Sequence, residues 1–412
     1  MDKTVVQRVE RHKYSWNKEM DDLCFKSKNL YNYCNYLVRQ EFINNKKVLD
    51  EYKLTGQLAK ENQVDFRALP SKTSQQIVKL LFKNWKSFFR SIKDYSKHPN
   101  KYLGKPRLPQ YKDKVKGRNV VIFTGQQFGI KDGYIYFCKK SGLVPLKTKV
   151  DNVCQVRIVP QSNCFVVEVV YEKEVKKVKG LKKGMYTSID LGINNMATLV
   201  TNKGDSVLVN GRVLKSMNQY YNKEKSRLQS FIGDRGSSNR IEALTYKRNN
   251  KIEDYMHKAS RYIVDYCIKN RIQNIVIGKN DGWKQEVNMR KSTNQNFVSI
   301  PYNKLIQMIQ YKAEEIGINV ILQEEAYTSK CDALALEPIK HHEKYLGKRV
   351  KRGLFRSSIG KYINADVNGA LNILRKVIGD KFISKLKTNR GLADNPVRIL
   401  PYKYAFDGLS SA

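Results

Sequence analysis

Apolar residues recur every three to four positions in the first quarter of the chain, and this spacing predicts helices. One helix is expected over 16–46, and a second begins after Pro70. The second helix has an apolar face whose large rings are expected in the core: Trp85, Phe88 and Phe89. Its opposite side carries cations that either form a solvated face or follow nucleic-acid phosphates: Lys79, Lys83, Lys86 and Arg90.

Between 110 and 182 the pattern changes to an alternation of apolar and polar residues, which is typical of strands. Four strands separated by Gly, Asp or Asn turns are expected, at 120–123, 134–137, 153–158 and 165–171. The N-terminal residues 3–11 alternate in the same way, so we expect them to join a small β-barrel or sandwich. A lysine-rich linker that includes Lys176 and Lys177 then indicates a domain boundary near residue 182.

The third region, after residue 182, contains both the helical spacing and the strand-like alternation of apolar residues. Its expected elements are strands ending in Asp190, at 197–201, at 207–210, at 274–278 and at 318–323, with helices at 212–270, at 302–316 and from Asp366 onward. Three successive strands, a helical stretch, a strand, a helix, a strand and a closing helix follow the order of the ribonuclease H fold. We therefore predict a multidomain α+β protein with a ribonuclease H-like α/β domain. The tail after residue 390 is expected to be poorly structured.

Composition narrows the class of partner. The chain has 412 residues with 77 Lys plus Arg against 38 Asp plus Glu, a net charge of +39 that favours polyanionic partners such as nucleic acids. Seven cysteines form no C-x-x-C pair, which argues against disulfides and a zinc site and for a reducing compartment such as the cytoplasm. No signal peptide is expected, because the N-terminus is charged from Asp2 and Lys3 onward, and no membrane span is expected, because the apolar runs are too short.

Two acids stand where a metal-dependent nuclease would need them. Asp190 ends a strand, and Asp366 lies in the first turn of the closing helix. Phosphodiester cleavage uses two divalent ions about 4 Å apart, and hard oxygen ligands suit Mg²⁺. The third acid is missing from the strand that ends at Gly278, although Asp281 follows shortly after. Glu324 and Glu325, at the end of the neighbouring strand, are the replacements, and only one of them can face the site well.

These residues resemble the TnpB family of transposon-encoded, RNA-guided DNA nucleases, which are relatives of type V CRISPR effectors. The matching strings are Ser188–Asn195 with Ala197-Thr198, Gly278-Lys279-Asn280 with Trp283-Lys284-Gln285, Asn294–Phe297 with Ile300-Pro301, Glu324–Lys330, and Asn364–Ala370. The resemblance covers 185–375 and implies a RuvC-like nuclease with Asp190, Asp366 and one glutamate as metal ligands, Glu325 first and Glu324 second. The chain departs from the common form by this relocated glutamate and by the absence of zinc cysteines.

The N-terminal half fits the family only in layout. The resemblance implies a β-barrel wedge domain over 1–14 and 110–182 and a helical recognition domain over 15–109. It further implies a RuvC-like nuclease domain over 183–380, with a helical insert at 212–270 and a basic loop at 326–363, followed by a tail over 381–412.

The activity implied is Mg²⁺-dependent, RNA-guided DNA cleavage at one site beside a short motif read by the protein. The partners are then a guide RNA and a double-stranded DNA target, with a monomer favoured and no membrane. Cations in the basic loop would draw the displaced strand to the site: Lys348, Arg349, Lys351, Arg352 and Arg356. Phe355 and Tyr362 either stack on bases or pack locally. A nuclease-inactive RNA-guided repressor and a protein-only transposase of the same fold are the alternatives.

Overall fold

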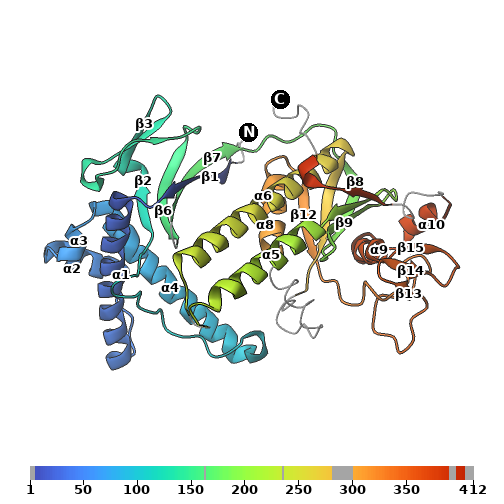
Figure 1. Ribbon diagram of the computed structural model, residues 1–412, viewed down its shortest axis with the longest axis horizontal. Helices are drawn as coiled ribbons and strands as arrows, with labels where there is room; N and C mark the ends of the chain where they lie inside the picture. Colours follow the sequence, from blue (N-terminus) through green and yellow to red (C-terminus); the bar gives the residue numbers. More distant parts are fainter. Residues whose placement is uncertain (1–4, 162–163, 234–235, 281–299, 389–395, 404–412) are drawn as a thin grey trace. The chain divides into compact units, whose positions relative to one another are not determined.

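The computed structural model describes residues 5–161, 164–233, 236–280, 300–388 and 396–403. The chain divides into two compact units, Met1–Glu174 and Val175–Ala412, and both combine helices with sheets (Figure 1). The prediction of a multidomain α+β protein is met at this level. Across the described ranges, no helix has an apolar stretch long enough to cross a bilayer.

The first unit contains two antiparallel sheets. One has the order β1 (Val5–Ser15), β7 (Cys164–Glu174), β6 (Val153–Gln161) and β2 (Val121–Thr124), and the other has β3 (Phe128–Lys131), β4 (Tyr134–Phe137) and β5 (Leu146–Lys147). The N-terminal strand joins the larger sheet, since Val5 pairs with Glu174 and Ser15 with Cys164. The strands are hydrogen-bonded as two separate sheets, so closure into a barrel stays a prediction.

Four helices complete the first unit: α1 (Lys18–Asn45), α2 (Glu51–Lys60), α3 (Val64–Arg67) and α4 (Ser71–Lys97). Asn17 caps α1 by accepting from the Met20 backbone N–H at 2.8 Å. Trp85 of α4 is buried against Phe42 with ring centroids 5.4 Å apart, and its indole N–H donates to Asn35 Oδ1 at 3.1 Å. The predicted core position of this ring is therefore confirmed, and Phe88 and Phe89 pack beside it half-buried.

The second unit is built on a six-stranded mixed sheet. Its order is β12 (Asn319–Gln323), β11 (Ile272–Gly278), β8 (Lys182–Asp190), β9 (Asn195–Thr201), β10 (Ser206–Asn210) and β16 (Val397–Ile399). Strands β8, β9 and β10 form an antiparallel meander, and β11 and β12 are parallel to β8 and to each other. Parallel pairing brings the carboxyl ends of β8, β11 and β12 to one edge of the sheet.

Helices cover both faces of this sheet. They are α5 (Arg212–Gln229), α6 (Asn239–Lys269), α8 (Tyr302–Glu314), α9 (Ala365–Ile378) and α10 (Lys381–Thr388). Side chains alternate along the strands, so Ile275 and Ile277 pack with α6 and α8, whereas Val276 between them packs with α9. The central strands are consequently buried on both sides.

Two segments differ from the sequence expectation. Residues 397–399 form strand β16, which pairs in parallel with β10, so the expected unstructured tail contributes to the sheet. The expected basic loop contains a small antiparallel sheet: β13 (Lys348–Lys351), β14 (Leu354–Arg356) and β15 (Tyr362–Asn364). The tail segment acquires strand structure by pairing with β10, which lies far away in the sequence. Strands β13, β14 and β15 instead pair with one another within one short stretch of the chain.

Candidate active site

Asp190 is the last residue of β8 and lies under the start of α9. The Ser188 hydroxyl donates to the Ala370 backbone carbonyl at 2.6 Å and ties the strand to the helix. Gly369 permits this approach, because a Cβ at that position would lie 3.0 Å from Asp190 Oδ2. A glycine one turn into the helix therefore brings the Asp190 carboxylate against the helix that carries the second acid.

Asp366 is held in the first turn of α9. The Asn364 side chain caps the helix by accepting from the backbone N–H of Asp366 at 2.9 Å and of Val367 at 3.3 Å. Asn195 Nδ2 donates to Asp366 Oδ2 at 2.7 Å, and Arg349 Nη2 lies 3.7 Å from Asp366 Oδ1. The cap fixes the backbone of the first turn, and Asn195 and Arg349 contact the Asp366 carboxylate from the neighbouring segments.

Glu325 follows β12 and enters the space beside the end of β11. Gly278 pairs with Gln323, and the Glu325 backbone N–H donates to Asn280 Oδ1 at 3.0 Å. A Cβ at Gly278 would overlap Glu325 Oε2 and the Ile373 side chain. The strand that lacks an acid thus ends in the residue that leaves room for a carboxylate from the next strand.

Glu324 turns the other way. Its carboxylate accepts from Lys376 Nζ at 2.8 Å and from the Ala326 backbone N–H at 2.8 Å, and its side chain is 59% exposed. Glu325 Oε2, in contrast, is buried and has no hydrogen-bond partner among the described residues. The structure brings Glu325 to Asp190 and Asp366 and leaves Glu324 at the surface.

The charged forms of Asp190 and Glu325 are disfavoured by their surroundings. Burial raises the pKa of Asp190 well above its usual value, Glu325 and Asp366 raise it further, and Arg349 offsets only part of the rise. Burial, followed by the charge of Glu324, raises the pKa of Glu325 to about 7, against a partial offset from Lys376. Both groups therefore favour a proton or a metal ion at neutral pH.

The donor atoms suit a hard divalent cation. Three carboxylates converge, and the buried Glu325 Oε2 and Asn195 Oδ1 are acceptors without partners in the described part of the chain. Within the described ranges, no three His, Cys, Asp or Glu side chains are close enough to hold an ion as they stand. Arg349 meanwhile contacts Asp366 from its other side. The three acids are near one another, and holding an ion would require their side chains to move closer together.

Two family models match the chain, mostly within the second unit. Residues 167–284 match OrfB_IS605, described as "Probable transposase", and residues 302–373 match the Cas12f1-like TNB domain. Among curated proteins, the TnpB-like protein ORF457 of Acidianus two-tailed virus is 28% identical over 242 residues, which span 56% of this chain and 49% of that protein. The CRISPR-associated endodeoxyribonuclease Cas12f1 of Sulfoacidibacillus thermotolerans is 32% identical over 159 residues, 37% of this chain and 34% of that protein.

Together these matches support a TnpB-like protein that is similar to the type V effectors. The matches span about half or less of the length of these curated relatives. Among solved structures, a Cas12f1–sgRNA–target DNA complex superposes with a TM-score of 0.55 at 15% identity, covering 87% of this chain and 83% of that one. This likeness concerns the fold.

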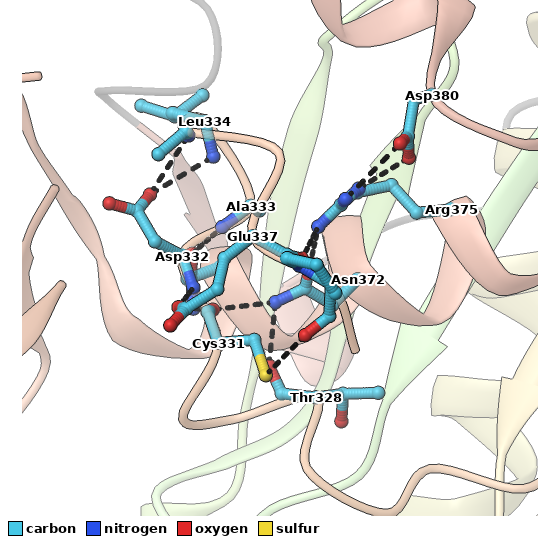
Figure 2. A network of polar contacts seen from close by, with 12 residues as sticks. Thr328, Cys331, Asp332, Ala333, Leu334, Glu337, Asn372, Arg375 and Asp380 are labelled. Carbon is cyan, nitrogen blue, oxygen red and sulfur yellow. Dashed lines mark hydrogen bonds and ion pairs between the residues drawn. The ribbon is translucent and has the colours of Figure 1, made fainter. Parts of the chain in front are cut away.

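A buried polar network joins the segment after Glu325 to helix α9 (Figure 2). Asn372 Nδ2 donates to the carbonyls of Thr328 at 2.8 Å and Cys331 at 2.7 Å, and Arg375 donates to the Glu337 carbonyl at 3.0 Å. Arg375 Nε also contacts Asp380 Oδ1 at 2.7 Å. These contacts fix the segment that follows Glu325 onto the helix that carries Asp366.

Sequence reasoning missed this network. Asn368, Asn372 and Arg375 lie on the buried side of an otherwise apolar helix, and their i, i+4, i+7 spacing was the available signal. Asn195, which orients Asp366, belongs to the Ser188–Asn195 string, but nothing in the spacing indicates that contact. Polar residues on a buried helix face indicate partners far away in the sequence, although the spacing does not name them.

The cations predicted to contact nucleic acid are exposed, and their role stays a prediction. This is so for Lys79, Lys83, Lys86, Arg90, Lys176, Lys177, Lys348, Arg349, Lys351, Arg352 and Arg356. Phe355 is buried, so the packing alternative holds for it, whereas Tyr362 is 49% exposed beside Arg356. Asp281 and the motif residues 283–285 and 294–297 lie outside the described residues.

Proposed function

We propose that this protein is an RNA-guided DNA endonuclease with a single RuvC-like site at Asp190, Glu325 and Asp366. The observation that carries the proposal is the fit between Gly278 and Glu325: the carboxylate fills the space that a side chain on β11 would need. The sheet order and the helices on both faces support a ribonuclease H-like domain. Its expected extent is 183–380.

The chain's own residues would hold the metal ions and orient the acidic side chains. Two Mg²⁺ ions, when bound, would activate a water molecule and stabilise the leaving oxygen. Asp190, Glu325 and Asp366 would hold them, and Glu324 is too exposed to be more than a second choice. Asn195 keeps Asp366 pointed at the site. Arg349 balances the charge of Asp366 and is placed to contact a phosphate.

The proposed partners rest on the net charge of the chain and on its similarity to other proteins. A net charge of +39 suits a guide RNA and a DNA duplex. The related Cas12f1 is named as an endodeoxyribonuclease, and the superposed structure is a complex with sgRNA and target DNA. We extend the proposal to a wedge domain of barrel type over 1–14 and 110–182 and a recognition domain over 15–109, whose exposed α4 cations would contact the duplex or the guide.

The decisive experiment is to purify the protein, sequence the RNA that accompanies it, and supply a plasmid matching that RNA beside randomised flanking bases. Cleavage that needs Mg²⁺, stops with EDTA and stops after RNase treatment supports the proposal. Cleavage that survives RNase treatment would instead support a protein-only transposase.

One observation favours a second candidate. Because no three metal-binding side chains of the described residues are closely gathered, a guided DNA-binding repressor without nuclease activity is the alternative. Stable, RNA-dependent target binding without cleavage at any Mg²⁺ or Mn²⁺ concentration would favour it.

A further inference from the structure

An open pocket of about 470 Å³ in the second unit has a cationic lining. It is lined by Asn194, Arg212, Lys215, Ser216, Gln219 and Arg352. Four of these residues lie on α5 at spacings of i, i+3, i+4 and i+7, so they share one face of that helix. The pocket therefore combines three positive charges with neutral hydrogen-bonding groups and contains no acid.

The pocket is built around the loop between β8 and β9. The Gly211 backbone N–H donates to the Asn194 carbonyl at 2.8 Å, and α5 begins at the next residue. A Cβ at Gly211 would overlap the Ile193 carbonyl and lie 3.0 Å from the Met196 backbone nitrogen. This close approach holds Arg212 and Lys215 beside Asn194.

Arg352 reaches the same loop from the β13–β14 hairpin. With the Asn194 amide oxygen turned toward it, the guanidinium donates through Nε at 3.0 Å and Nη2 at 3.1 Å. In the described ranges, no carboxylate forms an ion pair with Arg212, Lys215 or Arg352. Three cations with only neutral partners repel each other and favour an anion between them.

The pocket is joined to the carboxylate site through two pairs of neighbouring residues. Asn194 binds Arg352 in the pocket, and the next residue, Asn195, binds Asp366. On the hairpin, Arg352 faces the pocket and Arg349 contacts Asp366. The same loop and the same hairpin thus form both the pocket and one side of the acidic site.

We propose that this pocket binds a backbone phosphate of the DNA strand, next to the phosphate that is cut, and thereby sets the position of the strand over the acids. The proposal rests on the proposed function for the identity of the strand. No aromatic residue lines the pocket, so the contact reads phosphate and not base. Binding there is independent of sequence.

The test measures binding without cleavage. The full-length Asp190→Ala protein, with its accompanying RNA, is titrated with a fluorescent single-stranded DNA of mixed sequence between about 50 and 200 mM salt. Replacing Arg212 and Arg352 by Gln should weaken binding at least tenfold at about 150 mM salt and lower the log–log salt slope by about 0.7 for each cation removed. Lys223→Gln, an exposed lysine on the same helix outside the pocket, is the matched control.

Three outcomes would overturn the proposal. They are an unchanged affinity in the pocket variant, an equal loss in the Lys223→Gln control, and a loss of the accompanying RNA in place of DNA binding, which would assign the pocket to the guide. Thermal unfolding of each variant, and Arg352→Lys as a charge-preserving rescue, separate lost binding from lost folding. Because no turnover is measured, a failure of the nuclease proposal leaves this test valid.

Discussion

Two groups of acids lie beside helix α9, and they differ in whether hydrogen-bond donors surround their carboxylates. Asp332 is fully buried, and its carboxylate accepts from the backbone N–H groups of Leu334, Ala335 and Ser358 and from the Ser357 hydroxyl, at 2.7 to 3.2 Å. Glu337 is 2% exposed and accepts from the Asp332 and Leu346 backbone N–H groups at 2.7 and 2.8 Å. Figure 2 shows this side of the helix, where every acid drawn has a donor.

The acids of the second group, Asp190 and Glu325, are less buried than Asp332 and Glu337, but their carboxylates have fewer hydrogen-bond donors around them. Burial and two other carboxylates raise the pKa of Asp190, and Glu325 Oε2 has no hydrogen-bond donor among the described residues. The difference separates two uses of a buried charge. Acids supplied with donors stabilise a segment, whereas acids left facing one another store unfavourable energy that a bound cation removes.

The largest expected effect comes from Asp190→Asn. Cleavage should fall on the order of 10³-fold or more, because a proposed metal ligand becomes neutral. The free energy of unfolding without metal should stay level or rise by about 1 kcal/mol, because a repelled charge is removed. Plasmid cleavage with Mg²⁺ measures the first effect, and urea denaturation in EDTA measures the free energy of unfolding. A clear loss of stability would contradict the view of Asp190 as an unsatisfied acid.

The neighbouring glutamates provide a matched pair. Glu325→Gln should slow cleavage on the order of 10²-fold, whereas Glu324→Gln, which loses only an exposed ion pair with Lys376, should change it less than about threefold. Single-turnover cleavage with saturating guide measures both. Equal losses, or a larger loss at Glu324, would reverse the assignment.

At the satisfied group the same chemical change should have the opposite sign. Asp332→Asn should lower the free energy of unfolding by about 2 kcal/mol, because an amide cannot accept from all of the donors around it. Urea denaturation of Asp332→Asn and of Asp190→Asn under the same conditions compares their free energies of unfolding directly. Stability equal to that of the wild type would show that the Asp332 network contributes little.

The smallest effect is a pH dependence. The pKa of Glu325 is raised from 4.5 to about 7, so the folded state binds more protons than the unfolded state between these values. Without metal, stability should therefore fall as pH rises through this window, by about 1 to 2 kcal/mol, and stay low above it. Glu325→Gln should lack this component. A difference between wild type and variant that is constant from pH 5 to pH 8 would refute it.

Much of this site was predictable because it depends on local patterns. The strand that ends in Asp190, the helix opened by Asn364 with Asp366 in its first turn, and the basic face of α4 follow from periodicity, capping and charge. Glu325 was preferred only through the family resemblance, because alternation along β12 leaves either glutamate possible. The choice depends on Gly278, which lies 47 positions earlier in the chain.

Local patterns thus establish which elements form, which acids are candidates and which partner the charge favours, since each depends on residues within a few turns of one another. The three-dimensional fold was needed for the remainder: the carboxylate of Glu325 beside Gly278, the donors around Asp332, strand β16, and the cations gathered at Asn194. These features arise from contacts between distant segments. Spacing in the sequence carries no information about which distant residue supplies the missing partner.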